Sequence, residues 1–110
     1  MDKLDALESF AALSQQTRLD VFRLLIKAGP EGMLSGEIGD ALAVKQNTMS
    51  ANLSVLLNAG LVRKQRDGRT IRYFISFEAI RDLISFLMED CCGGRPEICA
   101  PLLNDLRLSC

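Results

Sequence analysis

Three cysteines lie close together near the C-terminal end of the 110-residue chain, within the segment DCCGGRPEIC at residues 90–99. Cys91 and Cys92 are adjacent, Gly93-Gly94 follows them, and Cys99 closes the segment. Thiolates bind soft metals, exchange with disulfides and act as nucleophiles, and a free thiol also packs as a small apolar group. Because the chain contains no histidine, an imidazole is available neither as a second ligand nor as a catalytic base.

The composition is typical of one globular domain that is large enough to bury a core. Hydrophobic residues make up 48% of the chain and charged residues 25%. The first ten residues are acidic and amphipathic, unlike a signal peptide, and no apolar run has the length of a membrane span. We therefore expect a cytoplasmic protein without membrane contact, in which four cysteines indicate metal binding, redox chemistry or packing more than disulfides.

The charges are segregated along the chain, although the net charge is only −1. Residues 43–76 contain six basic residues and one acidic residue, whereas the rest of the chain contains seven basic and thirteen acidic residues. We therefore expect a local basic patch on an otherwise acidic domain. It supports nucleic-acid binding only if the basic side chains lie on one surface.

Apolar residues at helical spacing predict five helices. Ser14 and Ser35 are expected to cap the second and third helices, Gly29-Pro30 to end the second, and Gly93-Gly94 to end the last. The apolar positions are Leu4, Leu7 and Ala11; then Leu19, Val21, Phe22, Leu25 and Ile26; then Ile38 and Leu42; then Met49, Leu53, Leu56 and Leu57; and finally Ile80, Leu83, Ile84, Leu87 and Met88.

Between the fourth and last helices, alternating apolar residues predict two strands at 61–65 and 70–76, joined by a hairpin at Asp67-Gly68. Two short helices separated by a turn at 43–45 and followed by a hairpin form the order of a winged helix-turn-helix. The sequence thus predicts a mainly α fold with a small β-hairpin. Residues 1–92 would form this folded domain, and residues 93–110 a C-terminal tail.

This order of elements suits DNA binding, because the second helix of the pair can enter a major groove with its first side chains at base edges. Gln and Asn pair with adenine, and a Thr methyl or Ala contacts a thymine methyl. The hairpin tip would reach the backbone or minor groove. The expected DNA-contacting residues are Lys45, Gln46, Asn47, Thr48, Ser50, Ala51, Asn52, Arg66 and Arg69. The alternative is a solvated helix face beside a solvated hairpin.

The segments LSQQTRLDVFRLL, SGEIGDAL and QNTMSANLSVLLNAGLVRKQRDGRTIRYFI resemble the ArsR family of metal- and metalloid-responsive repressors. The resemblance extends from about Leu7 to Leu87, and LLNAGLV followed by a basic, glycine-turned hairpin is its most specific part. It implies a homodimeric winged-helix repressor, not an enzyme, that leaves its double-stranded operator DNA when an inducer binds. Many members carry histidine near Ala51 and Asn52, so the resemblance does not give the operator sequence.

The residues also predict a dimer interface. The first helix is apolar on more than one side and the last helix along one stripe, so a self-complementary contact between them would cover both. The alternative is that each helix packs wholly on its own core.

The resemblance also implies where the inducer binds. The third-helix segment MLSGEIGDAL has no cysteine, and the lack of histidine removes a zinc site on the last helix. Cys91, Cys92 and Cys99 resemble a subgroup with a vicinal pair at the end of the last helix and a third cysteine beyond, whose inducer is trivalent arsenic. Arsenic(III) takes three thiolates in a pyramid. No permanently bound cofactor is expected, and the inducer could be arsenite, antimony(III) or methylarsenite.

Other roles for the thiols stay open. A redox-sensing repressor would pair Cys91 or Cys92 with Cys99. A structural zinc site would add Cys110, although the spacing is unlike paired CxxC motifs, and we otherwise expect Cys110 to be a mobile extra thiol. A cysteine-dependent arsenate reductase is the alternative from a different class, but the sequence offers no histidine as its base. Cys91 could also pack as a core thiol.

Overall fold

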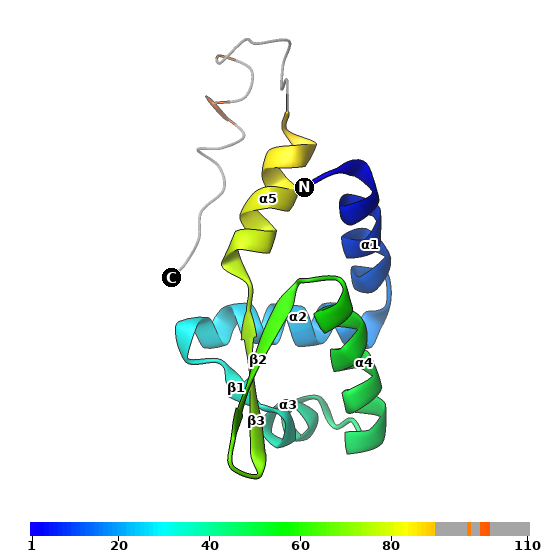
Figure 1. Cartoon of the computed structure of the whole chain (residues 1–110), viewed down its shortest axis with the longest axis vertical. Coiled ribbons are helices and arrows are strands. Elements are labelled where there is room, and N and C mark those ends of the chain that lie inside the picture. Colours follow the sequence, from blue (N-terminus) through cyan, green and yellow to red (C-terminus); the bar gives the residue numbers. More distant parts are fainter. Residues whose placement is uncertain (90–96, 98–99, 102–110) are drawn as a thin grey trace.

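The computed structural model describes residues 1–89, residue 97 and residues 100–101 of the chain. Its elements confirm the predicted winged helix-turn-helix order (Figure 1). They are α1 (Lys3–Leu13), α2 (Gln16–Ala28), a single 3-10 turn η1 (Gly29–Glu31), β1 (Met33–Leu34), α3 (Ser35–Leu42), α4 (Gln46–Asn58), β2 (Val62–Asp67), β3 (Thr70–Ile75) and α5 (Phe77–Leu87).

The caps of α2 and α3 differ from those that we predicted. The Ser14 hydroxyl donates to the Ala11 carbonyl at 2.8 Å and ends α1, so Gln15 becomes the N-cap of α2 and its side chain accepts from the Arg18 N–H. Ser35 is the first residue of α3 and not its cap, because the extended residue before it, Leu34, belongs to β1. The Glu37 carboxylate accepts the Leu34 N–H at 2.8 Å and satisfies one of the donors at this end.

The turn between α3 and α4 is tight and left-handed. Ala43 has φ 55°, and its N–H and that of Val44 donate back to carbonyls in the last turn of α3. Such 5→2 and 6→1 bonds end a helix and reverse the chain within a few residues. The predicted turn at 43–45 is thus confirmed, and it sets α4 directly across α3.

The sheet has three antiparallel strands in the order β1-β3-β2. Asp67 pairs with Thr70, which leaves Gly68 and Arg69 as a two-residue turn with Gly68 at φ 63°. A glycine at positive φ matches the hairpin turns that suit strand twist, so the predicted hairpin is confirmed. We did not predict β1, because two residues are too few to show alternation.

The core lies where α2, α3 and α4 meet the sheet. Its buried apolar members are Ala12, Val21, Leu25, Ile38, Met49, Leu53, Leu56, Leu61, Val62, Tyr73 and Ile75. The predicted apolar positions of α4 therefore face inward, as their spacing indicated.

Helix α5 is shorter than we predicted. Ser76 caps its start, and the helix ends at Leu87 with Met88 as its C-cap and Glu89 in the following turn, so it does not run on to Gly93-Gly94. Glu89 places a negative charge at the negative end of the helix, which disfavours continuation. No helix among the described residues has the length and apolar character that crossing a bilayer requires.

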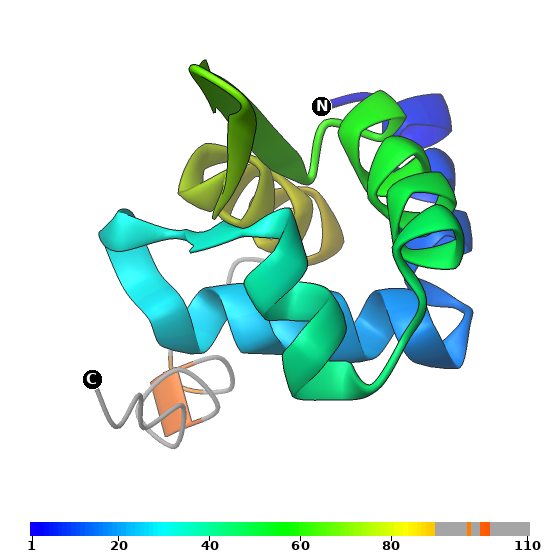
Figure 2. The same cartoon turned by 90° about the horizontal axis from the view of Figure 1, so that it is seen from below.

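The elements are separated along the long axis of the molecule. Helices α1 and α5 lie at one end, and α3, the first turn of α4 and the hairpin tip lie at the other (Figure 1). Figure 2 views the molecule from this second end, where the hairpin and α4 stand on different sides of α3. The fold therefore places the start of α4 and the hairpin tip, both of which the sequence predicts to contact DNA, at the same end of the molecule.

Candidate nucleic-acid interface

Helix α4 has an apolar inner face and a polar outer face. Met49, Leu53 and Leu56 are fully buried in the core. The outer face begins just before the helix at Lys45 and continues through its first two turns. Its exposed members are Lys45, Gln46, Asn47, Thr48, Ser50 and Ala51. Six of the seven residues that we predicted around the start of this helix are thus accessible to a duplex.

Asn52 departs from the prediction. Its side chain is only 8% exposed, its Oδ1 accepts from Arg18 Nη1 at 3.2 Å, and its Nδ2 donates to the Thr48 carbonyl at 3.2 Å. A side chain that is buried and bonded at both polar atoms is not presented to a base edge. Because Asn52 lies three residues after the buried Met49, it shares the inner stripe of α4.

Gln46 is exposed, but its side chain is already engaged. Its Nε2 donates to the Ser35 carbonyl at 3.3 Å, and the amide lies directly over Gly39 of α3. A side chain at position 39 would collide with this amide. Gln46 therefore joins α4 to α3. The outer face keeps Thr48, Ser50 and Ala51, and also Asn47, whose Oδ1 accepts the Thr48 N–H at 2.8 Å while its Nδ2 stays a possible donor.

The hairpin carries the predicted basic residues on two faces. Arg66 pairs across the sheet with Ile71, and Lys64 with the buried Tyr73, so these two cations share the face that packs on the core farther along. Arg69 is exposed in the turn itself. Arg72 has a different task, because its Nη1 donates to the Glu31 carbonyl at 3.2 Å and ties the hairpin to η1.

The cationic side chains of the hairpin form no ion pair within residues 1–89. Within residues 1–89 the one ion pair is Arg81–Asp82, at 3.8 Å on α5. No carboxylate of this part of the chain therefore neutralises Arg66 or Arg69, and the polar outer face of α4 and a positive hairpin tip occupy the same end of the molecule (Figure 1).

Helices α1 and α5 expose large apolar side chains at the opposite end. On α1 the buried positions are the small residues Ala6, Ser9 and Ala12, whereas Leu4, Leu7 and Phe10 are exposed. On α5, Phe77, Ile84 and Leu87 are exposed. Leu83, which we had placed on the same apolar stripe, is only 9% exposed and packs within its own subunit.

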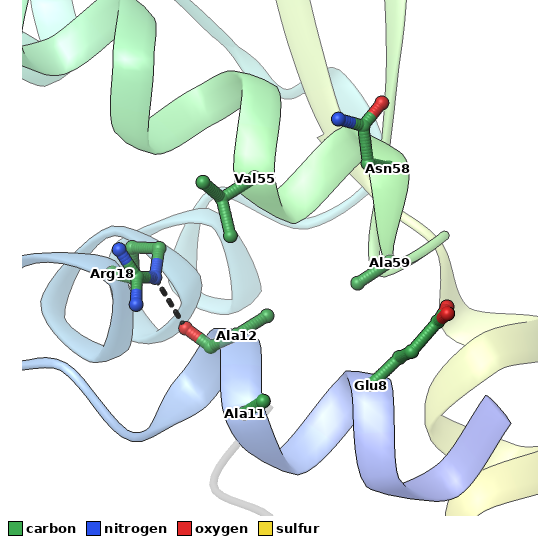
Figure 3. Close-up of a pocket in the computed structure, with 7 residues that line it drawn as sticks. All are labelled: Glu8, Ala11, Ala12, Arg18, Val55, Asn58 and Ala59. Carbon is green, nitrogen blue, oxygen red and sulfur yellow. Dashed lines mark hydrogen bonds between the residues drawn. The ribbon is translucent and has the colours of Figure 1, made fainter. Parts of the chain in front are cut away.

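An open groove runs between α1 and α4, with a volume of about 370 Å³. Its walls are Glu8, Ala11, Ala12, Arg18, Val55, Asn58 and Ala59 (Figure 3). At one end of the groove, Arg18 Nε donates to the Ala12 carbonyl at 2.6 Å. We did not predict a role for Arg18, but its position three and seven residues before the buried Val21 and Leu25 is a signal, because it puts a cation on the core side of α2.

The predicted inducer ligands Cys91, Cys92 and Cys99, and also Cys110, lie outside the described residues. In the part of the chain that the structure describes, no three candidate metal-ligating side chains gather at one place. The boundary that we predicted between residues 92 and 93 falls outside this part as well.

Comparison with known proteins agrees with this geometry. A helix-turn-helix domain family matches residues 13–65. The uncharacterized HTH-type transcriptional regulator YbzH of Bacillus subtilis is 32% identical over 76% of this chain and 96% of its own length. A protein of Streptomyces lividans named "Probable mercury resistance operon repressor" is 29% identical over 68% of this chain and 58% of its own length.

A solved structure shows the same fold. The homodimeric winged helix-turn-helix DNA-binding domain from Mycobacterium bovis, described as a possible ArsR-family transcriptional regulator, superposes with a TM-score of 0.63. It is 26% identical and covers 78% of this chain and 80% of its own.

Proposed function

The chain belongs to the ArsR-type helix-turn-helix transcriptional regulators, and from this membership we propose that it is an arsenic(III)-responsive repressor. It binds operator DNA in the cytoplasm as a homodimer and dissociates when the inducer joins its C-terminal cysteines. One observation supports DNA binding most strongly: the exposed outer face of α4 lies at the same end of the molecule as the hairpin tip, whose cations pair with no carboxylate of residues 1–89 (Figure 1).

In this proposal α4 reads bases and the hairpin holds the backbone. Asn47, Thr48, Ser50 and Ala51 are short enough to let the helix approach the groove floor, and they offer donors, acceptors and methyl groups. Arg66 and Arg69 contribute contacts that do not depend on sequence. Two subunits related by a two-fold axis would select an inverted repeat whose half-sites lie about one or two helical turns apart.

The dimer would form through the apolar faces of α1 and α5. Leu4, Leu7 and Phe10 of one helix and Phe77, Ile84 and Leu87 of the other are exposed in the single subunit. Exposed apolar side chains that cluster on neighbouring helices favour self-association. The homodimeric domain from Mycobacterium bovis, which shares the fold, supports the same assembly.

The three cysteines in residues 91–99 support arsenic(III) as the inducer. Three cysteine thiols displace the three hydroxides of arsenous acid, their protons leave with the hydroxides as three water molecules, and a neutral pyramidal centre remains. Such a centre needs neither histidine nor a fourth ligand, and the chain has no histidine. A coupling free energy of about 1–3 kcal/mol between the inducer site and DNA would lower operator affinity by roughly 5- to 150-fold.

A second inducer is favoured by one relative. The Streptomyces lividans protein is named for mercury resistance, and mercury(II) is another soft ion that binds thiolates, with two ligands in place of three. The vicinal pair Cys91-Cys92 alone could satisfy it, whereas arsenite would need Cys99 as well.

Operator release distinguishes these inducers. Reduced protein is bound to a duplex that it has selected from a randomised library, and release is measured with arsenite, antimonite, methylarsenite, mercury(II) and peroxide. Cys91→Ser, Cys92→Ser and Cys99→Ser should each keep DNA binding and lose the response to arsenite, while Cys110→Ser responds as the parent. Methylarsenite needs only two sulfur ligands, so the response to it should persist in one of these three variants.

The same panel contains the results that would contradict the proposal. Arsenite induction that persists in Cys99→Ser would exclude a three-thiol site. Release by peroxide together with failure of arsenite would identify a redox sensor. Release by mercury(II) alone, retained in Cys99→Ser, would identify a mercury sensor.

A further inference from the structure

A continuous chain of hydrogen bonds joins α1, α2 and α4. Arg18, in the first turn of α2, donates from Nε to the Ala12 carbonyl at 2.6 Å and from Nη1 to Asn52 Oδ1 at 3.2 Å. Asn52 then donates from Nδ2 to the Thr48 carbonyl at 3.2 Å. Thr48 belongs to the outer face of α4, so the chain leads from the C-terminal end of α1 to the part of α4 that would face DNA.

Each link of this chain is directional. Ala12 lies in the last turn of α1, where carbonyls have no partner within the helix and the helix dipole is negative, so a guanidinium is a favourable donor there. Bonds from a cation are shorter and stronger than neutral ones. The guanidinium is planar and rigid, so two bonds from one Arg18 side chain restrict the direction of both acceptors.

Apart from this hydrogen-bond chain, α1 contacts α4 through small side chains, because Ala12 lies in the shared core and Ala11 borders an open groove. Ala11 and Ala12 face Val55, Asn58 and Ala59 across the open groove (Figure 3). Small side chains on facing helices, with a groove of about 370 Å³ between them, leave room for α4 to tilt. Arg18 lies at one end of this groove and, through its bonds to Ala12 and Asn52, makes a polar connection between the two helices.

We propose that Arg18 and Asn52 are positioning residues that set the angle of α4 to α1. The inference rests on the proposed function, because α1 would lie in the dimer interface and α4 in the major groove. Fixing α4 to α1 would then fix the two α4 helices of the dimer relative to each other. Two half-sites are read together only at one such relation, so the clamp would determine preference for the operator over other DNA.

The test replaces both side chains of the clamp together. Asn52→Leu alone strands the Arg18 cation, which costs stability for an unrelated reason. In the double variant Arg18→Met/Asn52→Leu both side chains become apolar groups of similar size, so neither keeps an unpaired polar group. The Ala12 carbonyl loses its donor from Arg18, so the stability of the variant is measured first. The matched control is Asn58→Leu, which lies on the same helix and the same groove but outside the hydrogen-bond chain.

Two measurements are made on the full-length double variant, after its urea unfolding and its sedimentation have been compared with the parent. Residual dipolar couplings of the DNA-free protein give the angle between α1 and α4. Fluorescence anisotropy gives affinity for the selected duplex and for a scrambled duplex across a salt series. We expect a changed angle, a roughly tenfold or greater loss for the selected duplex, and unchanged affinity and salt slope for the scrambled duplex.

The outcomes separate the clamp from the proposed function. An unchanged α1–α4 angle overturns the clamp whatever the protein binds. A double variant that prefers the selected duplex as strongly as the parent overturns it too, because operator preference would then not depend on Arg18 and Asn52. A parent protein without preference for any selected duplex contradicts the proposed function instead, and the angle still decides the clamp.

Discussion

Replacing Leu87 by alanine tests the dimer face with a change whose size the structure allows us to calculate. Leu87 is 55% exposed in the single subunit. Fully burying a leucine side chain stabilises by about 1.5–3 kcal/mol, so roughly half of that remains to be gained in the dimer, and alanine would keep a part. A two-fold interface contains the residue twice. We therefore expect Leu87→Ala to weaken dimerisation by about 2 kcal/mol, or roughly 30-fold in the dissociation constant.

The matched control is Leu19→Ala on α2. Leu19 is 43% exposed and lies outside the α1 and α5 faces, so its truncation removes a similar apolar area without touching the proposed interface. Sedimentation equilibrium over a range of protein concentrations gives both dissociation constants. The reasoning is refuted if Leu87→Ala dimerises as the parent does, or if Leu19→Ala weakens the dimer equally.

The DNA affinity of Leu87→Ala adds a second check on the same variant. Because α4 and the hairpin remain intact, operator binding should fall at low protein concentration and return as the concentration is raised. A loss that persists at high concentration would mean that the substitution had altered the DNA-binding end and not the assembly.

Three further predictions concern the hairpin, a glycine and alkaline pH. Arg66→Ala and Arg69→Ala should each weaken binding to every duplex and lower the salt slope by about 1, measured by anisotropy titration. Gly32 has φ +64°, and an added Cβ would collide with the Tyr73 carbonyl, so Gly32→Ala should lose about 1–3 kcal/mol of unfolding free energy. In Gly36→Ala, where the space is open, about 0.5–1 kcal/mol should be gained; urea denaturation compares the two. Burial raises the pKa of Tyr73 above 10.0, so the folded state keeps the proton that the unfolded chain loses. Stability should therefore fall above about pH 10, and less so in Tyr73→Phe.

The features that could be predicted from the sequence are those with a strong local signal. The spacing of Met49, Leu53 and Leu56 indicated an inner face, and all three are buried. Asp67-Gly68 indicated a hairpin because few residues adopt positive φ as easily as glycine, and Gly68 does adopt it. Periodicity and turn chemistry operate within a few residues, so they do not depend on tertiary packing.

The features that were missed depend on competition or on long-range contacts. Ser14 has the chemistry of an N-cap residue, but in the structure it is the C-cap of α1. A local sequence pattern does not show which of two adjacent helices such a residue caps. Asn52 has the chemistry of a base-reading residue, but its position three residues after Met49 places it on the buried face of α4. Its residue type therefore gave the wrong prediction, whereas its helical position indicated burial. Arg18 meets Asn52 across 34 positions of sequence, a contact that no periodicity shows.

Covalent geometry limits the distance between Cys91 and the proposed dimer face. Four peptide links separate Leu87 from Cys91, so their Cα atoms lie within about 15 Å of each other. In the proposed function, a ligand that gathers Cys91, Cys92 and Cys99 would therefore act within this distance of the end of α5. It can favour release only if it binds one arrangement of the two subunits better than the other.

The proposed clamp would couple that arrangement of the subunits to the DNA-facing helix through a few contacts. In the proposed dimer α5 shares its interface with α1, and α1 ends at the carbonyl that Arg18 holds. A shift of α1 would be passed by the guanidinium to Asn52 and so to the carbonyl of Thr48. Loss of the clamp should therefore reduce operator preference and inducer response together, whereas loss of a cysteine should remove the response alone. This difference separates the element that transmits the signal from the site that receives it.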